Sequence, residues 1–453
     1  MQIWHVVVLT LALMIALLAI RVPVGFSLGL SGGIGLVLLQ GTDYASNTLG
    51  SVPFANTATF TLTIIPMFIL MGMLAVRANI ADNVFTVANH FVRRAPGGLG
   101  VATVMACAGF AAVSGSSIGT AATMAKLSVN QMRGNGYPAH LAAGIVAVAG
   151  TLGVMIPPST FLVLYAVLAE ESVAQMLAAG IVPGLLSAAG YITYIMVVAH
   201  RQVPRGQPTD LSASIDGART ELAAKRTSST VRSLPWRGIL HIGILFTVVL
   251  GGMYSGLFTS TESAAIGALA ALVILMVENR RLGWAGIWKH FRQSLLDTAE
   301  STSMVFFVVV GSAVLSTFFV AAGVTQAIAE WAGNLPLPPM VVLGILLICL
   351  IPLGMFLESM SILIITVPLL YPIATDFGFS GVWLGIMIVK FIEMGMVTPP
   401  VGILAFVVSG ATGVKPEQVF RGVTPLVGID LITSTILFLF PAITLFLPSL
   451  VVS

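Results

Sequence analysis

The sequence is short of charge. Asp, Glu, Lys and Arg together make up 8% of its 453 residues, whereas soluble domains carry about 25%. Hydrophobic residues make up 57% of the chain, and the mean hydropathy is +1.03. Apolar segments of about 20 residues, long enough to cross the hydrocarbon core of a bilayer, recur along the chain. The scarcity of charge therefore excludes a water-soluble fold and predicts an all-α polytopic membrane protein.

Cysteine, histidine and clustered carboxylates are scarce as well. The two cysteines, Cys107 and Cys349, lie in apolar runs, and the six histidines are scattered without metal-ligand spacing. No Gly-rich loop follows a strand, so neither ATP nor an organic cofactor is expected. A membrane enzyme would need a cluster of His, Asp or Glu at membrane depth, and the sequence offers only Lys390 and Glu393 there. These absences favour a transporter without cofactor or nucleic-acid partner over an enzyme.

The apolar segments and the positive charges together predict a topology. Two apolar stretches, 100–128 and 341–372, are interrupted by polar or Gly/Pro turns, and we interpret them as re-entrant hairpins. With the N-terminus outside, each of the 20 Lys and Arg residues except Lys390 falls on or near the cytoplasmic side, as the positive-inside rule requires. We therefore expect a multi-pass inner-membrane protein with both termini in the periplasm. Ten plain crossings are expected near 3–20, 24–40, 58–76, 140–169, 175–199, 239–257, 262–277, 300–321, 382–410 and 424–447.

Polar and amphipathic segments lie between these crossings. The stretch 200–236 is rich in Ser, Thr, Arg and Pro and is interpreted as a solvated cytoplasmic linker, whose basic excess could also contact anionic membrane lipid. Segments 78–96 and 283–298 mix apolar with charged residues and predict amphipathic helices at the cytoplasmic face. Residues 1–20 lack a basic n-region and a small-residue cleavage site, and are interpreted as a retained first helix.

The chain repeats itself at an offset of 242 residues, the difference between 153 and 395. GVMIPPSTFL begins at Gly153 and GMVTPPVGIL at Gly395, and the same offset relates Ser117 to Ser359. Each half therefore holds a hairpin turn followed by a helix with a Pro-Pro break. In the predicted topology the helix at 140–169 runs outward and the helix at 382–410 runs inward, so the two repeats are inverted.

The Pro-Pro breaks point to a site. Two prolines remove two backbone donors, so carbonyls near 150–154 and 395–398 are expected to lose their helical partners. Freed carbonyls and small polar hairpin tips suit a bare cation, and half-helix N-termini suit an anion. The chemistry, with few carboxylates, favours a sodium ion. The candidate ion- and substrate-binding residues are Ser114, Gly115, Ser116, Ser117, Gly150, Thr151, Gly153, Pro157, Glu358, Ser359, Gly395, Thr398, Pro399 and Gly402.

Four charged residues fall in apolar segments. Lys390 and Glu393 lie three residues apart on one predicted helix, so they are expected to pair, either as a functional group or as a self-neutralising structural pair. Glu262 is expected to cap a helix that begins at Ser263, and Asp430 has no evident partner.

Several of these motifs resemble the large permease subunit of the TRAP (tripartite ATP-independent periplasmic) transporters, the DctM/SiaM-like family. GSSIGTAATMAKLSVNQM, GYPAHLAAGIVAVAGTLGVMIPPSTFLVLYAV and AAGIVPGLL are similar to its first-half pattern. TSTESAAIGA, FLESMSILIITVPLLYPI and IEMGMVTPPVGILAFVVSGATG are similar to its second half. The resemblance runs from about residue 20 to the end. Lys390 and Glu358 depart from the family pattern.

The resemblance implies an elevator-type, sodium-driven importer of a small organic acid, of the C4-dicarboxylate, keto acid or sugar acid class. It also implies two partners, a small four-helix DctQ-like membrane subunit and a periplasmic substrate-binding protein. A stand-alone sodium/dicarboxylate symporter or an ion antiporter of the same architecture is the alternative.

The expected architecture is thus an elevator with a moving and a fixed part. The moving part comprises the hairpins and broken helices, 100–169 and 341–410, and the fixed scaffold comprises the remaining helices. The scaffold is expected at 1–77, 170–199, 238–282, 299–340 and 411–453, with amphipathic arms at 78–99 and 283–298 and the linker at 200–237.

Overall fold

The structure, a computed structural model, describes residues 3–451 except 21, 79, 93, 94, 203–234, 325, 328, 329 and 331–335. Every regular element in these ranges is a helix. The expected linker at 200–237 therefore lies almost wholly outside the described residues. Eight described helices are long and apolar enough to cross a membrane, or nine if one bent pair counts as a span. The prediction of an all-α polytopic membrane protein is confirmed.

Each of the ten apolar stretches forms a helix or a chain of short helices. They correspond to α1 (Ile3–Ala19), α2 (Val24–Gln40), η1–α4 (Phe60–Arg77), α9–α11 (Ala139–Leu168), α12 (Val173–Gln202), α14–α15 (Arg237–Tyr254), α16 (Ser260–Glu278), α17 (Gly283–Ala321), α22–α23 (Gly381–Thr412) and α24 (Pro416–Leu439). The tail continues with α25 (Pro441–Leu445) and η6 (Pro448–Leu450). The start of α16 is fixed by a capping box, in which Thr259 and Glu262 exchange backbone and side-chain hydrogen bonds. Glu262 thus caps a helix as expected, although the helix begins at Ser260.

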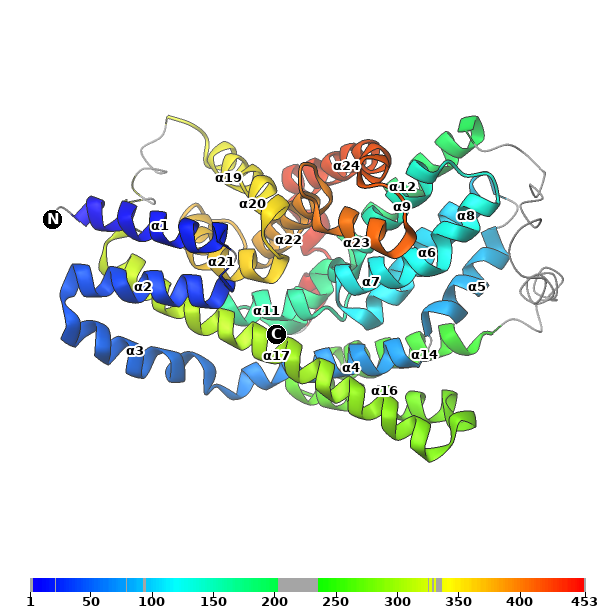
Figure 1. Cartoon of the computed structure of the whole chain (residues 1–453), viewed down its shortest axis with the longest axis horizontal. Coiled ribbons are helices and arrows are strands. Elements are labelled where there is room, and N and C mark those ends of the chain that lie inside the picture. Colours follow the sequence, from blue (N-terminus) through cyan, green and yellow to red (C-terminus); the bar gives the residue numbers. More distant parts are fainter. Residues whose placement is uncertain are drawn as a thin grey trace.

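The two interrupted stretches form helical hairpins. The first consists of α6 (Gly98–Ser114) and the continuous run of α7 (Ser117–Met124), η2 (Ala125–Val129) and α8 (Asn130–Gly134). The second consists of α19 (Pro339–Ile348) and α20 (Leu350–Phe356), followed by α21 (Ser359–Asp376). Figure 1 shows α6 reaching the centre from the end that carries α5, and α19–α20 from the end that carries the N-terminus.

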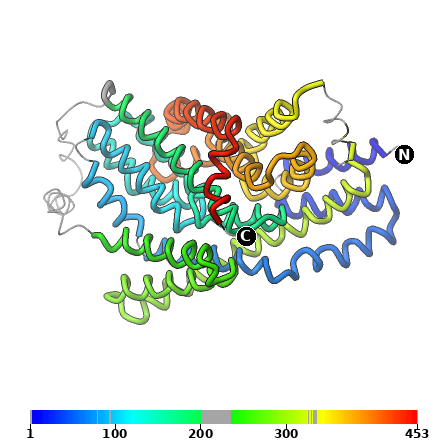
Figure 2. The backbone as a smooth tube through the Cα atoms, turned by 180° about the vertical axis from the view of Figure 1, so that it is seen from behind, coloured from blue at the N-terminus to red at the C-terminus, as the bar shows by residue number. Residues whose placement is uncertain are grey.

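Six helices form a lateral bundle: α1, α2, α3 (Thr42–Thr57), α4, α16 and α17. Figure 1 shows α1, α2, α3 and α17 side by side along one edge of the molecule, and the view from behind in Figure 2 agrees. Glycines allow the close contact of α2 and α17, because a Cβ on Gly311 would lie 2.2 Å from the carbonyl oxygen of Gly25. Arg77 of α4 pairs with Asp297 of α17.

Two features of this bundle differ from expectation. The helix α3 was not expected, because its sequence is polar for a helix in a membrane protein and contains Pro53. The segment 283–298, expected as a separate amphipathic arm, is the first part of α17, which continues without a break for 39 residues. The other expected arm is α5 (Ile80–Val92), which packs between α6 and α14.

Most of the other helices form a central bundle around α22, comprising α6 to α12 and α19 to α25, and α14 packs on α5 and α6 at its side. Both α12 and α24, expected in the fixed scaffold, pack directly against the broken helices. The contact of α24 with α9 is so close that a Cβ on Gly422 would lie 1.8 Å from the carbonyl oxygen of His140. The Trp383 indole of α22 donates to the Leu437 carbonyl of α24 (3.0 Å).

Candidate functional site

The first hairpin turns at Gly115 and Ser116. Gly115 has a φ of 58°, a left-handed conformation that glycine adopts without strain. Ser116 is the N-cap of α7, and its hydroxyl accepts from the Gly119 amide (3.2 Å). Thr160 of α11 donates to the Gly115 carbonyl (3.0 Å), which ties this tip to the first broken helix.

The second hairpin repeats the N-cap of the first, although Leu357, equivalent to Gly115, is extended rather than left-handed. Glu358, which corresponds to Ser116 at the offset of 242, is the N-cap of α21. Its Oε2 accepts from the Ser361 amide (3.2 Å), and Ser361 corresponds to Gly119. The repeat found in the sequence is therefore also a repeat of capping geometry. Glu358 has a structural task at this tip that a neutral serine performs in the other half.

The two tips meet at one buried carboxylate. Ser117 and Ser359, the first residues of α7 and α21, both donate to Oε1 of Glu393 on α22, over 3.4 and 2.9 Å. Ser359 also contacts the Met396 sulfur. Glu393 is 2% exposed, and its Oε2 has no hydrogen-bond partner among the described residues. The structure thus brings Ser117 and Ser359 together, and the group that joins them is one that the candidate set omitted.

The broken helices are present in both halves. The axis bends by 46° between α9–α10 (Ala139–Met155) and α11 (Thr160–Leu168). The second break separates α22 from α23 (Ile403–Thr412), with Gly402 at a φ of 50°. The first Pro-Pro pair is buried, whereas Pro399 and Pro400 are exposed in this chain. The two breaks therefore share the Pro-Pro pair but differ in surroundings and in backbone, because Thr160, equivalent to Gly402, already belongs to α11.

Some of the carbonyls that were expected to be free have partners. The Ser159 hydroxyl donates to the Val154 carbonyl (2.6 Å), and the Thr398 hydroxyl donates to the Met394 carbonyl (2.6 Å). The Thr398 amide donates to the Gly395 carbonyl (3.0 Å). The expectation was wrong for the Val154 and Gly395 carbonyls, because hydroxyl and amide groups just beyond each break fold back onto the last turn. Fewer backbone oxygens are left for a cation than the Pro-Pro motif alone suggests.

Glycines bring each hairpin onto the broken helix of its own half. A Cβ on Gly153 would lie 2.5 Å from the Ser116 carbonyl oxygen, and a Cβ on Gly395 would lie 2.5 Å from the Ile351 carbonyl oxygen. Gly150 packs equally closely on Ala121. The Ser114 hydroxyl hydrogen-bonds Thr120 across the first turn (2.6 Å). Ser114, Gly115, Ser116, Gly150 and Gly153 therefore cluster at the first tip.

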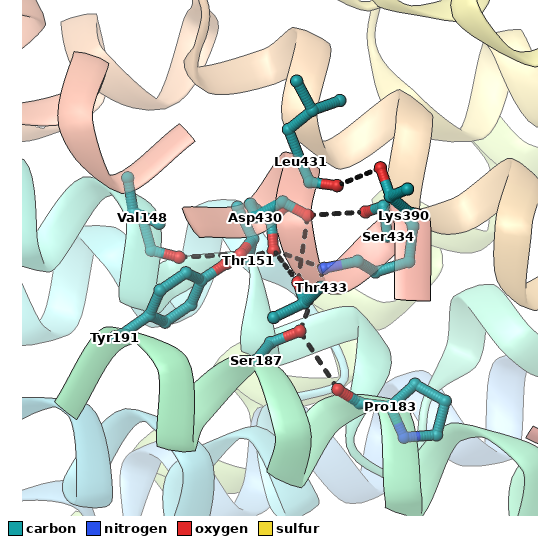
Figure 3. Close-up of polar contacts among 11 residues, drawn as sticks. Val148, Thr151, Pro183, Ser187, Tyr191, Lys390, Asp430, Leu431, Thr433 and Ser434 are labelled. Carbon is teal, nitrogen blue, oxygen red and sulfur yellow. Dashed lines mark hydrogen bonds and ion pairs between the residues drawn. The ribbon is translucent and has the colours of Figure 1, made fainter. Parts of the chain in front are cut away.

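A polar network lies beside the site in the centre of the bundle (Figure 3). Lys390 of α22 forms an ion pair with Asp430 of α24 and donates to the Ser187 hydroxyl of α12 (2.9 Å). The Tyr191 hydroxyl of α12 donates to Asp430 Oδ1 (2.6 Å) and also hydrogen-bonds Thr151 of the first broken helix. One network thus joins both broken helices to α12 and α24.

This network corrects two expectations. Lys390 and Glu393 do not pair with each other, because their side chains leave α22 toward different neighbours: Lys390 toward α24 and α12, and Glu393 toward the hairpin tips. Asp430, expected to have no partner, accepts from both Lys390 and Tyr191. Sequence spacing shows which residues share a helix face, but it does not show what lies opposite that face.

The two bundles meet at a cavity of about 450 Å³. Its polar lining consists of Gln40, Tyr44, Asn56, Ser312, Ser316 and Thr317, and no charged side chain lines it. At its edge the Ser312 hydroxyl of α17 donates to the Ile364 carbonyl of α21 (3.0 Å). That carbonyl is available because Pro368, four residues later, has no amide hydrogen to donate.

The comparisons with known proteins agree with this architecture. Residues 11–443 match the family model described as the DctM component of the tripartite ATP-independent periplasmic transporter. This chain belongs to that family. It is 34% identical to the C4-dicarboxylate TRAP transporter large permease protein DctM of Pseudomonas aeruginosa, over 93% of this chain and 94% of the relative. It is 30% identical to the isethionate TRAP transporter permease protein DctMQ of Oleidesulfovibrio alaskensis, over 95% of this chain and 64% of the relative.

A solved structure supports the fold. The YdaH transporter of Alcanivorax borkumensis, described as having an unusual topology, superposes with a TM-score of 0.60 over 90% of both chains at 15% identity. Family membership makes the chain a multi-pass membrane subunit of a secondary transporter rather than an enzyme. A large TRAP permease implies a small membrane subunit and a periplasmic binding protein as partners.

Proposed function

We propose that this chain is the large permease subunit of a sodium-coupled, binding-protein-dependent transporter that imports a small organic acid by an elevator movement. The observation that supports this proposal most directly is that Ser117 and Ser359, one from each half of the repeat, both donate to the buried carboxylate of Glu393. A site shared by both halves is what alternating access around a midplane site requires.

Sodium is the cation that the chemistry favours. The hairpin tips and broken helices supply hydroxyl and carbonyl oxygens and one central carboxylate, and hard cations prefer such oxygen ligands. The described residues contain no group of three or more His, Cys, Asp or Glu that could hold a metal ion. Glu393 is the carboxylate between the tips, whereas Glu358 is engaged in capping α21, and a single negative charge favours a monovalent over a divalent ion.

A small organic anion is the solute that the tips favour. Ser117 and Ser359 begin α7 and α21, so two helix N-termini point to the centre of the site, and helix N-termini attract anionic groups. The two named relatives are assigned C4-dicarboxylates and isethionate. The C4-dicarboxylate, keto acid and sugar acid classes all fit, and the uncharged polar cavity between the bundles is a candidate route for the solute.

The packing favours the whole central bundle as the moving unit. The elevator hypothesis first placed α12 and α24 in the fixed scaffold. However, both helices are bound to the broken helices by three contacts: the Lys390–Asp430 pair, the Tyr191 hydrogen bonds and the Gly144–Gly422 contact. We therefore assign α12 and α24 to the moving part, and the lateral bundle to the fixed part. The Ser312–Ile364 hydrogen bond then crosses the sliding interface.

The partners and the orientation complete the proposal. The DctMQ relative is longer than this chain, which covers 64% of it, and we propose that a separate small subunit takes the place of the additional part. We place both termini in the periplasm and the linker between α12 and α14 in the cytoplasm. In Figure 1 the N-terminus and the described ends of that linker lie at opposite ends of the molecule, which supports this orientation for the N-terminus.

The experiment is uptake of radiolabelled succinate into proteoliposomes that contain this chain and the proposed small subunit, with the proposed binding protein outside. A binding protein specific for another acid would be identified first by a thermal-shift screen, and its ligand would replace succinate. We expect uptake only with an inward sodium gradient and with the binding protein present. Uptake without the binding protein would favour the stand-alone symporter, and full activity on a proton gradient alone would exclude sodium coupling.

A further inference from the structure

The two halves of the site differ at three positions that carry charge, one of which is Glu358, equivalent to Ser116. At the offset of 242, Glu393 corresponds to Thr151, and Lys390 corresponds to Val148. Thr151 donates to the Val148 carbonyl of its own helix (2.7 Å) and does not reach a hairpin tip through any hydrogen bond recorded for the described residues. Only the second half therefore places an acidic group between the two tips.

Among the described residues, no basic group forms an ion pair with Glu393. Lys390, one turn earlier on α22, is paired with Asp430. The charged groups that act on Glu393 from neighbouring elements are acidic, namely Glu358 of α21 and Asp430 of α24, and Tyr191 of α12 is the other titratable neighbour. Two serine hydroxyls donate to Oε1, whereas Oε2 is buried without a hydrogen-bond partner among the described residues. A buried carboxylate oxygen without a partner is unfavourable, so this atom is suited to a ligand.

This arrangement has a consequence for an anionic solute. The N-termini of α7 and α21 would attract a solute carboxylate, but the Glu358 carboxylate already caps α21, and the Glu393 carboxylate accepts from the first residues of both helices. In a site that excludes water, two like charges within a few ångströms repel strongly. An anion therefore binds between the tips only when the charge of Glu393 is neutralised, by a bound cation or by a proton.

We propose that Glu393 is the coupling residue: its Oε2 binds a hard monovalent cation, and this binding must precede the binding of the anionic solute between the hairpin tips. The inference rests on the proposed function and adds the group that makes symport obligatory. It also makes the two halves of the site unequal, because the equivalent Thr151 carries no charge.

The experiment measures cation binding to the full chain in detergent by thermal unfolding. Sodium chloride is titrated against choline chloride at constant ionic strength, in wild type, Glu393→Gln and Glu393→Asp. The glutamine keeps an acceptor for Ser117 and Ser359 but removes the charge. Glu262→Gln is the matched control, because it also removes one carboxylate and glutamine can still complete the capping box of α16.

We expect sodium to raise the melting temperature of wild type and of Glu262→Gln to the same extent. In Glu393→Gln the half-saturating sodium concentration should rise roughly tenfold or more, which corresponds to a loss of about 1.4 kcal/mol, and Glu393→Asp should lie between the two. Each variant must elute as a single peak in size-exclusion chromatography. If Glu393→Gln does not, Glu393→Asp decides: an unchanged sodium response in that variant contradicts the proposal.

The outcomes separate the inference from the function on which it rests. A normal sodium response in Glu393→Gln would overturn the role of Glu393 while leaving sodium coupling intact. No sodium response in wild type would overturn both. In proteoliposomes that take up solute with sodium, Glu393→Gln should lose concentrative sodium-driven uptake. Wild-type accumulation by this variant would also contradict the inference.

Discussion

Lys390 of α22 and Asp430 of α24 form a buried ion pair 40 residues apart in the chain, with 4% and 5% of their side chains exposed. The pair lies beside the proposed transport site and shares no hydrogen bond with Glu393. Its neighbours are Ser187 and Tyr191 of α12. The arrangement indicates a structural role, namely to fasten α22 to the two helices that flank it.

The first prediction is that this pair can be replaced only as a pair. Lys390→Met or Asp430→Asn alone leaves one buried charge without a partner and should destabilise the chain by about 3–5 kcal/mol. The double variant Lys390→Met/Asp430→Asn should recover most of the wild-type melting temperature and retain sodium-dependent uptake. Melting in detergent and uptake in proteoliposomes are the measurements. A well-folded double variant without uptake would show that the pair takes part in transport itself.

The second prediction concerns the glycines beneath the hairpin tips. Alanine at Gly153 or Gly395 would place a Cβ 2.5 Å from a backbone oxygen that cannot move without the hairpin. We expect each substitution to destabilise the chain by about 1–3 kcal/mol and to lower uptake. Gly428→Ala is the control, because nothing lies within 4 Å of its added Cβ, so it should be neutral or slightly stabilising. Equal behaviour of all three variants would show that hairpin packing is not limiting.

Much of the fold could be predicted from the sequence, because apolar length and the offset of 242 are local or periodic properties. They located all ten helical stretches, both turns and the equivalence of Ser117 with Ser359. They did not locate α3, since its residues give no hydropathy signal. The continuity of α17 was hidden by the charged residues of its first turns.

The centre of the site could be predicted only in part. Glu393 was recognised as an intramembrane charge, but its spacing from Lys390 suggested the wrong partner. Its true partners lie 276 and 34 residues away, on two different hairpins. Likewise, the partners of the Val154 and Met394 carbonyls are hydroxyls of Ser159 and Thr398, whose rotamers no sequence pattern specifies. Contacts between helices depend on tertiary packing. A single sequence shows which residues share a helix face, but not which residues of other helices lie opposite that face.

The third prediction compares the two serines that hold Glu393. Ser359 lies 2.9 Å from Oε1 and Ser117 lies 3.4 Å from it, so Ser359→Ala should weaken sodium-dependent stabilisation more than Ser117→Ala. A hydrogen bond to a charged group contributes about 1.5–3 kcal/mol, and the shorter bond should lie nearer the upper end. Ser128→Ala is the control, because that hydroxyl bonds only within its own helix. The reverse order of effects would contradict the geometry of the two tips.

The fourth prediction tests the interface between the bundles. If the central bundle moves, the Ser312–Ile364 hydrogen bond must break during each cycle. Ser312→Ala should change the melting temperature little, because one hydrogen bond contributes about 0.5–1.5 kcal/mol, yet it should alter the uptake rate at saturating solute. Thr298→Ala, on the same helix but bonded to the Ser294 carbonyl of that helix and away from the cavity, should leave the rate unchanged. Identical rates in both variants would place the sliding surface elsewhere.

The most direct test of the account is the accessibility of the two hairpin tips from the two sides of the membrane. Ile118 and Met360 are equivalent at the offset of 242, both half-buried and outside the polar contacts. Single cysteines there, in a background without Cys107 and Cys349, would be labelled with a membrane-impermeant maleimide from each side of oriented vesicles. We expect sodium and solute to change the two labelling rates in opposite directions. When labelling of one position from the cytoplasm slows, labelling of the other position from the periplasm should become faster. Labelling of both positions from the same side under every condition would contradict the inverted hairpins and the elevator movement.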